Sequence, residues 1–147
     1  GGFVFHLGET TQESLSYWNL NEYKFKKEPF IVMQKLFKGL DKVNHAPRIE
    51  AFTGFPKGTV TKNFPFTVSL TAKDAEGEKI TYDYYASGTK EGILQYYVND
   101  RISLKKEGDG SSVTLYAPAV PGIYRIYGAA RDSSGNAAIT NRTLKVE

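Results

Sequence analysis

The sequence predicts a mainly β protein, an antiparallel sandwich of about seven strands over residues 47–147 that follows an N-terminal strand, loop and helix. Three observations predict this fold class. Beyond Pro47 the segments alternate apolar and polar residues with period two. Turn-forming residues separate these segments at intervals typical of a sandwich. Before Pro47, the clearest pattern has the spacing of a helix.

The composition places the chain among ordinary globular proteins. Of its 147 residues, 40% are hydrophobic and 24% are charged, which argues against wholesale disorder. No apolar run approaches the roughly 20 residues of a membrane-spanning helix, so no membrane partner is expected. The net charge of +3 comes from interspersed acids and bases, which predicts no nucleic-acid partner. The lack of cysteine excludes disulfides and cysteine catalysis.

The N-terminal segment predicts a short strand at residues 3–7, although five residues do not separate a strand from a buried helix. A polar stretch and a loop with Trp18 follow. Residues 29–38 predict an amphipathic helix, because Pro29 suits a first helical turn and Gly39 is placed to end it. Its apolar residues recur at helical spacing: Phe30, Met33, Leu36, Phe37 and Leu40.

The residues His45-Ala46-Pro47 predict a linker, since a proline favours an extended predecessor. They divide the chain into a segment at 1–46 and a sandwich at 47–147. Within the sandwich, residues 64–72 give the strongest strand pattern, with every second residue apolar. Pro65 on the outer side of this strand indicates an edge or the start of regular pairing. One set of side chains faces inward: Phe64, Phe66, Val68, Leu70 and Ala72.

A turn at residues 73–78 leads into a second strand, in which Ile80, Tyr82 and Tyr84 share a face. The two strands form either a hairpin or a sandwich corner. Further strands are predicted at 93–104 (one or two), 113–117, 123–131 and 137–146, with a tight turn at 132–136. Tyr124, Ile126, Gly128 and Ala130 point inward, and Tyr124 is placed to form a tyrosine corner. This pattern is typical of an immunoglobulin-like sandwich.

Two stretches of the sandwich resemble bacterial polycystic-kidney-disease-type and cadherin-like modules. Residues 121–127, Pro-Gly-Ile-Tyr-Arg-Ile-Tyr, running into Asp-Ser-Ser-Gly-Asn at 132–136, resemble the final hairpin of these modules. The run Asp-Ala-Glu-Gly-Glu at 74–78 is similar to an acidic turn of the same modules. The resemblance implies the fold. The Trp-Asp-Phe-Gly-Asp-Gly core of strict polycystic-kidney-disease repeats is missing from the sequence.

The N-terminal part resembles the end of the (β/α)8 barrel of secreted bacterial glycoside hydrolases of the family 2 type. The resemblance lies in residues 2–9, 16–20, 32–37 and 44–49, which correspond to a last strand, a Trp-bearing loop, a helix and an Ala-Pro lead into an immunoglobulin-like module. It implies a bacterial parent enzyme that is secreted, periplasmic or on the cell surface. Active sites of such barrels lie at the carboxyl ends of the strands, so His6 and Glu9 are implied to be former barrel-mouth positions.

No catalytic residue is predicted in this chain, which opens abruptly on an apolar run and is expected to be a fragment of a larger protein. Glycoside hydrolysis needs two carboxylates across a sugar cleft, and Glu9 and Glu13 are the only acids near the implied barrel mouth. No cofactor and no metal site are predicted. Cadherin-like modules hold Ca²⁺ with clustered acids, but turn formation explains the candidate donors better and leaves calcium open: Asp74, Glu76, Asp109 and Asp132.

Aromatic residues make up 14% of the chain, and exposed aromatic rings stack on sugars in carbohydrate-binding modules. Alternation places Tyr85 and either Tyr96 or Tyr97 on the outer side of a sheet, and Trp18 lies in the N-terminal loop. Outward tyrosines are equally ordinary cross-strand partners. These four residues are the candidate carbohydrate-binding set.

The sequence therefore predicts a non-catalytic accessory or spacer module from the C-terminus of a secreted carbohydrate-active enzyme, with the missing barrel as its partner. The alternative is a binding module that takes a polysaccharide through outward tyrosines, or another protein through a sheet edge. Without barrel neighbours, the strand at 3–7 has unpaired backbone groups. Either a homodimer through this strand or a disordered start is expected.

Overall fold

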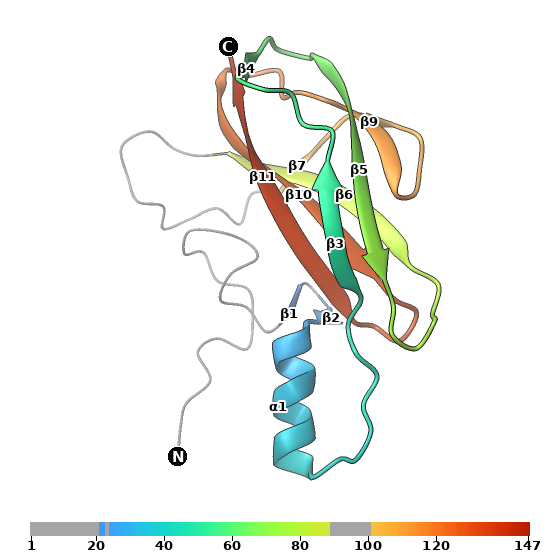
Figure 1. Cartoon of the computed structure of the whole chain (residues 1–147). Coiled ribbons are helices and arrows are strands. Elements are labelled where there is room, and N and C mark those ends of the chain that lie inside the picture. Colours follow the sequence, from blue (N-terminus) through green and yellow to red (C-terminus); the bar gives the residue numbers. More distant parts are fainter. Residues whose placement is uncertain (1–20, 23, 89–100) are drawn as a thin grey trace.

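The computed structural model describes residues 21–22, 24–88 and 101–147, which form two sheets packed face to face with a helix beneath them (Figure 1). This arrangement confirms the predicted class, a mainly β sandwich preceded by one helix. The strand predicted at 3–7 lies outside the described residues. No helix in the described ranges has the length and apolar character needed to cross a membrane.

The smaller sheet has four strands in the order β3-β5-β9-β8. They are β3 (Arg48–Thr53), β5 (Pro65–Lys73), β9 (Ser112–Tyr116) and β8 (Lys106–Glu107). The predicted strand at 64–72 is β5, and its alternate residues Phe66, Val68 and Leu70 are buried. Pro65 is the first residue of β5, which lies between two neighbours, so it marks the start of pairing and not a sheet edge. Phe64 precedes the strand and is exposed, contrary to its predicted inward position.

The larger sheet has five strands in the order β4-β11-β10-β6-β7. They are β4 (Thr59–Val60), β11 (Ala137–Val146), β10 (Gly122–Arg131), β6 (Thr81–Gly88) and β7 (Ile102–Ser103). The last hairpin follows the prediction closely, since β10 and β11 pair from Gly122↔Val146 to Arg131↔Ala137. All neighbours in this sheet are antiparallel except β11 and β4, which are parallel.

The turn between β5 and β6 crosses from one sheet to the other, because β5 belongs to the four-stranded sheet and β6 to the five-stranded sheet. The two strands therefore form a sandwich corner and not a hairpin. The described part of the sandwich has more strands than the predicted count, since β4 and β8, of two residues each, are too short to show an alternating pattern. The strand β7 lies within the region predicted at 93–104, of which residues 93–100 are outside the described ones.

The core lies between the two sheets, where the inward residues of both meet. The largest buried aliphatic side chains are Val68, Leu70, Leu115, Ile126 and Leu144, and burying such a side chain contributes roughly 1.5–3 kcal/mol. Tyr84 and Tyr124 belong to this core, and their hydroxyl groups donate to backbone carbonyls. The Tyr124 hydroxyl donates to the carbonyl of Val120 at 2.7 Å, which confirms the predicted tyrosine corner.

The helix α1 (Glu28–Lys38) begins one residue before the predicted start and ends at Gly39, whose φ of 61° is left-handed. It follows a two-stranded sheet of β1 (Asn21–Glu22) and β2 (Phe25–Lys26). Ile31 is buried, but the residues of the predicted apolar face include the exposed Leu36 and Phe37. The helix extends below the sandwich (Figure 1). The predicted helix is confirmed, but its predicted apolar face is not the buried one, because Ile31 is not among the residues of that face.

Candidate functional site: a polar joint at the base of the sandwich

Two turns at the lower end of the sandwich in Figure 1 have the same structure. One follows β5 and begins at Asp74, and the other joins β10 to β11 and begins at Asp132. In each, the aspartate Oδ1 accepts the backbone N–H four residues later, from Glu78 and from Asn136, both at 2.8 Å. Both sequences read Asp-x-x-Gly-x, and both glycines have positive φ, 78° and 85°. The repeated sequence pattern therefore gives a repeated turn.

The two turns lie side by side and bring three carboxylates together. The Ser134 hydroxyl donates to Glu78 Oε1 at 2.6 Å, which ties one turn to the other. One oxygen each from Asp74, Glu78 and Asp132 lies within 4.8 Å of the others. Asp132 is only 6% exposed, and its carboxylate accepts from the backbone and the side-chain amide of Asn136. Hydrogen bonds of this kind stabilise a charged carboxylate away from water.

The strand β2 is attached to the second of these turns. The Lys26 N–H donates to the carbonyl of Gly135 at 2.9 Å. Lys26 and Asn136 form an isolated parallel β-bridge. The Phe25 ring lies 4.8 Å from the guanidinium of Arg131, which also pairs with Asp83 Oδ2 at 3.0 Å. The chain is thus fixed to the sandwich immediately before α1 begins.

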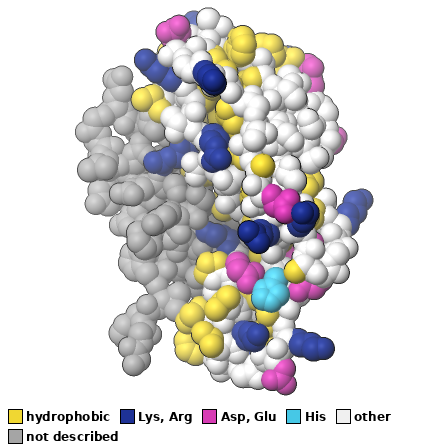
Figure 2. Space-filling view, in the orientation of Figure 1, with side chains coloured by type: hydrophobic (Ala, Val, Ile, Leu, Met, Phe, Trp, Pro, Cys, Tyr) yellow, Lys and Arg dark blue, Asp and Glu magenta, His cyan; other side chains and the backbone are white. Residues whose placement is uncertain are grey.

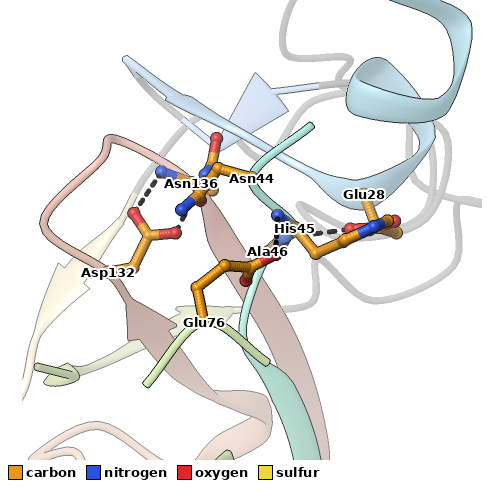
Figure 3. Close-up of polar contacts among 7 residues, drawn as sticks. All are labelled: Glu28, Asn44, His45, Ala46, Glu76, Asp132 and Asn136. Atoms are coloured by element: carbon orange, nitrogen blue, oxygen red, sulfur yellow. Dashed lines mark hydrogen bonds and ion pairs between the residues drawn. The ribbon is translucent and has the colours of Figure 1, made fainter. Parts of the chain in front are cut away.

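The chain is fixed again where it leaves the helix and enters the sandwich (Figure 3). Glu28, in the first turn of α1, contacts His45 Nδ1 at 2.7 Å through Oε1 and accepts the Ala46 N–H at 2.9 Å through Oε2. From the sandwich, Glu76 Oε1 accepts the His45 N–H at 3.3 Å. The amide of Asn136 contacts that of Asn44. We call this set the base joint: Glu28, Asn44, His45, Ala46, Glu76, Asp132 and Asn136.

The base joint connects elements and contains no arrangement for nucleophilic catalysis. Its hydrogen-bonding groups are carboxylates, amides and one imidazole. The Nδ1 atom of His45 faces Glu28, and in the described part of the chain no hydroxyl is bonded to that ring. A nucleophile activated by a neighbouring base is the usual mark of a covalent catalytic site, and the joint has none.

The four acids considered as calcium donors from the sequence do not all come together in the structure. Asp74 and Asp132 come together, and Glu76 instead bonds the linker at His45. Asp109 lies apart from them in an ion pair with Lys106 at 3.0 Å. Both Asp74 and Asp132 serve the turns, as predicted. Sequence reasoning missed Glu78 and Asn136, which the shared Asp-x-x-Gly-x pattern could have indicated.

Tyr85 lies on the outer side of the five-stranded sheet, as alternation predicts, but it is not exposed. Its side chain is 4% exposed, with its ring stacked on that of Tyr127 at 5.0 Å and the Arg101 guanidinium 4.0 Å from its centroid. Ala129 and Ile139 complete a second apolar cluster there. Because its faces are covered, Tyr85 offers no ring for stacking on a sugar, which corrects that expectation. The other candidate residues lie outside the described ones: Trp18, Tyr96, Tyr97, His6 and Glu9.

A concave feature lies at the end of the sandwich opposite the base joint. It is an apolar depression of about 350 Å³ lined by residues such as Ile102, Val120 and Tyr124. Two polar side chains at its rim have partners, since the Tyr116 hydroxyl donates to Glu107 and the Lys105 ammonium lies 4.1 Å from the Tyr116 ring centroid. The base joint, which connects three segments of the chain, is therefore the stronger candidate site.

No protein-family model matches the chain, and no curated protein matches it. Among solved structures, it is similar to the PKD domain of an M14-like peptidase from a Thermoplasmatales archaeon, with 15% identity and a TM-score of 0.43 over 71% of this chain and 98% of that domain. It is also similar to a superoxide reductase, neelaredoxin, from Ignicoccus hospitalis, with 20% identity and a TM-score of 0.36 over 71% of this chain and 82% of that chain.

Proposed function

We propose that this chain is a non-catalytic accessory module that holds its N-terminal helical segment in a fixed direction relative to the β-sandwich. The observation that carries this proposal is the base joint. The linker at 44–46 is hydrogen-bonded by Glu28 from the helix side and by Glu76 from the sandwich side. Each such bond contributes about 1 kcal/mol, and together they restrain a segment that would otherwise be free to rotate.

The parent protein in this proposal is a secreted bacterial glycoside hydrolase, and the module acts as its spacer or support outside the cytoplasm. The support is the sequence resemblance of residues 2–9, 16–20, 32–37 and 44–49 to the end of a (β/α)8 barrel, in the order strand, loop, helix and Ala-Pro linker. The missing barrel is then the domain whose direction the base joint sets. Purified chain should show no glycoside hydrolysis, because the two carboxylates of that reaction belong to other strands.

A carbohydrate-binding role is the alternative, and it depends on Trp18, Tyr96 and Tyr97 now that Tyr85 is buried. Affinity electrophoresis in gels that contain soluble polysaccharides separates the two roles. A spacer migrates equally with and without polysaccharide. Retardation by one polysaccharide, lost in a Trp18→Ala or Tyr97→Ala variant, would support a binding module in place of the spacer.

Hydrogen exchange at two backbone amides tests the base joint directly. The N–H groups of His45 and Ala46 donate to Glu76 and Glu28, so both should exchange more slowly than exposed amides. Glu28→Ala should remove the protection at Ala46, and Glu76→Ala should remove it at His45. The matched control is Glu50→Ala, which breaks the surface ion pair between Glu50 and Lys73. Rapid exchange of both amides in the unsubstituted chain would contradict a fixed linker.

A second candidate function is cation binding by the carboxylates of Asp74, Glu78 and Asp132, which lie beside the base joint and share Asp132 with it. Asp74 Oδ2 is buried and has no hydrogen-bond partner in the part of the chain that the structure describes. It belongs to the convergent set with Glu78 and Asp132, and an unpaired buried carboxylate oxygen is costly. Calcium prefers carboxylate oxygens, so these three residues would supply part of its coordination shell.

Thermal unfolding in the presence of CaCl₂ or of EDTA tests this second function. Calcium that binds only the folded chain raises the melting temperature, and Asp74→Asn should remove that increase. Asp109→Asn, at the acid that pairs with Lys106 away from the cluster, should leave it unchanged. Equal melting temperatures in calcium and EDTA would leave the hydrogen-bonded joint as the whole function of the site.

A further inference from the structure

Histidine is the one side-chain type in the base joint that ordinarily changes its charge between pH 5 and 8. The imidazole of His45 lies between the linker and the helix, with Nδ1 at 2.7 Å from Glu28 Oε1 (Figure 3). Figure 2 shows this histidine, in cyan, at the surface of the molecule. The two side chains are 44% and 43% exposed, so protons from the solvent reach the contact that joins the linker to α1.

The strength of this contact depends on the protons that the imidazole carries. With both ring nitrogens protonated, His45 and Glu28 form an ion pair, whose hydrogen bond is roughly twice as strong as one between neutral groups. A neutral imidazole donates from only one ring nitrogen, and with that proton on Nε2 the lone pair of Nδ1 faces the carboxylate. Protonation therefore strengthens the contact, and loss of the proton weakens it.

The effect extends to the backbone of the linker through the second oxygen of Glu28. While Oε1 contacts the ring, Oε2 accepts the Ala46 N–H at 2.9 Å. A carboxylate that the imidazole holds keeps its second oxygen in place for this amide, because the two oxygens move as one rigid group. The Ala46 N–H therefore reports the state of the contact between His45 and Glu28.

The elements packed around His45 carry several acids, on α1 and on the turns at 74–78 and 132–136: Glu28, Asp74, Glu76, Glu78 and Asp132. Glu76 accepts the His45 N–H at 3.3 Å. No Lys or Arg of the described residues forms an ion pair with Glu28, Glu76 or Asp132. The cations nearest along the chain are Lys27, Lys42, Arg48, Lys73, Lys79 and Arg131, of which Lys73 pairs with Glu50 and Arg131 with Asp83. A cationic imidazole is thus surrounded by groups that attract it.

We propose that the base joint is sensitive to pH and holds α1 to the sandwich more tightly when the His45 imidazole carries its second proton than when it is neutral. The inference rests on the proposed function, because only a joint that fixes the helix can be loosened. In the accessory module, the acidity of the surroundings then sets how firmly the N-terminal segment keeps its direction.

Hydrogen exchange of the Ala46 N–H at pH 5.5 and 7.5 tests the proposal, with each rate divided by the intrinsic rate at that pH to give a protection factor. We expect the protection factor to be about two- to fivefold higher at pH 5.5, the range that an exposed ion pair produces. Glu28→Gln, which keeps an acceptor oxygen but no charge, and His45→Gln should both remove the difference. His6→Gln, at the other histidine of the chain, is the matched control and should retain it.

The Asn136 N–H serves as the reference amide within the same molecule. It donates to Asp132 Oδ1 at 2.8 Å and should be equally protected at both pH values. A change there that matches the change at Ala46 would show a general loosening of the fold and would overturn the assignment to His45.

The remaining outcomes separate this proposal from the base joint itself. Equal protection of Ala46 at the two pH values, higher protection at pH 7.5, or a difference that persists in His45→Gln would overturn the pH sensitivity while the joint stands. A difference lost in His6→Gln would overturn it as well, since the effect would belong to the other histidine. No protection of Ala46 at either pH in the unsubstituted chain would contradict the joint, and with it the proposed function.

Discussion

At the scale of single residues, Gly54 shows how one backbone position constrains the four-stranded sheet. Gly54 has φ of 89°, and a Cβ atom there would overlap the carbonyl oxygen of Thr67 and lie 3.0 Å from Val68 Cα. Gly58 has a similar φ of 79°, but a Cβ atom there meets nothing within 4 Å. Comparing substitutions at Gly54 and Gly58 therefore separates two destabilising effects. Both positions carry the strain of a left-handed backbone, and only Gly54 adds a steric clash.

We predict that Gly54→Ala destabilises the chain considerably more than Gly58→Ala does. Gly58→Ala carries only the strain of positive φ, about 1 kcal/mol. Gly54→Ala adds a clash with rigid backbone of β5, so its cost should exceed about 3 kcal/mol. Urea unfolding monitored by circular dichroism measures both. Equal losses in the two variants would contradict the close approach of Gly54 to β5.

Tyr84 gives the chain a predicted loss of stability at alkaline pH. Burial, with a smaller effect of Tyr82, raises the pKa of the Tyr84 phenol from 10.0 to about 12. The folded state therefore keeps this proton between pH 10 and about 12, where the unfolded state releases it. The stabilisation is fully present below pH 10 and is lost as the pH rises toward 12.

Urea unfolding between pH 9 and 11 checks this prediction. The free energy of unfolding should fall over that range, and part of the decrease should disappear in Tyr84→Phe, which has no phenol to ionise. That variant also loses the hydrogen bonds from the hydroxyl to the carbonyls of Gly110 and Ser111, at about 1 kcal/mol at neutral pH. An identical pH slope in both proteins would contradict the burial of Tyr84.

For Tyr85, the sequence predicted the side of the sheet on which the residue lies but not the burial of its ring. Alternation correctly predicted its side of the sheet, because successive side chains of a strand point to opposite faces. It did not predict burial, since the cover comes from Arg101, Tyr127 and Ile139, which lie on other strands or loops. A pattern along one strand contains no information about what packs against its outer face.

At the scale of elements, the long strands could be predicted closely and the short ones could not. The expected strands at 123–131 and 137–146 differ by at most one residue from β10 and β11, because both alternate over many residues and a Gly-containing turn joins them. The helix bounds were also predictable, from Pro29 and Gly39. Strands of two residues, such as β4 and β8, exist only because longer neighbours pair with them.

The turn between β10 and β11 should depend strongly on Asp132. Asp132→Ala removes the acceptor for the backbone N–H and the side-chain amide of Asn136, both buried. Leaving buried donors without partners costs about 1–3 kcal/mol, whereas Asp109→Ala, at an exposed ion pair, should stay within about 0.5 kcal/mol. Thermal unfolding compares the two, and a tolerated Asp132→Ala would contradict the role of this turn in the base joint.

At the scale of the whole molecule, the base joint could not be predicted from the sequence. Its contacts join residues far apart along the chain: 31 positions from His45 to Glu76 and 92 from Asn44 to Asn136. No local pattern specifies such pairs, because they depend on how the two sheets pack and on which end of the sandwich the helix approaches. The predicted linker at 45–47 was placed correctly between helix and β3, but its hydrogen bonds are a property of the folded chain.

The most direct test of the fixed direction is the distance between a spin label on the helix and one on the sandwich. The chain has no cysteine, so Lys38→Cys and Lys145→Cys, both at exposed positions, label α1 and β11 alone in double electron–electron resonance. A joined helix predicts one narrow distance distribution that broadens when Glu28→Ala is added. A broad distribution without that substitution, or no broadening with it, would contradict the base joint.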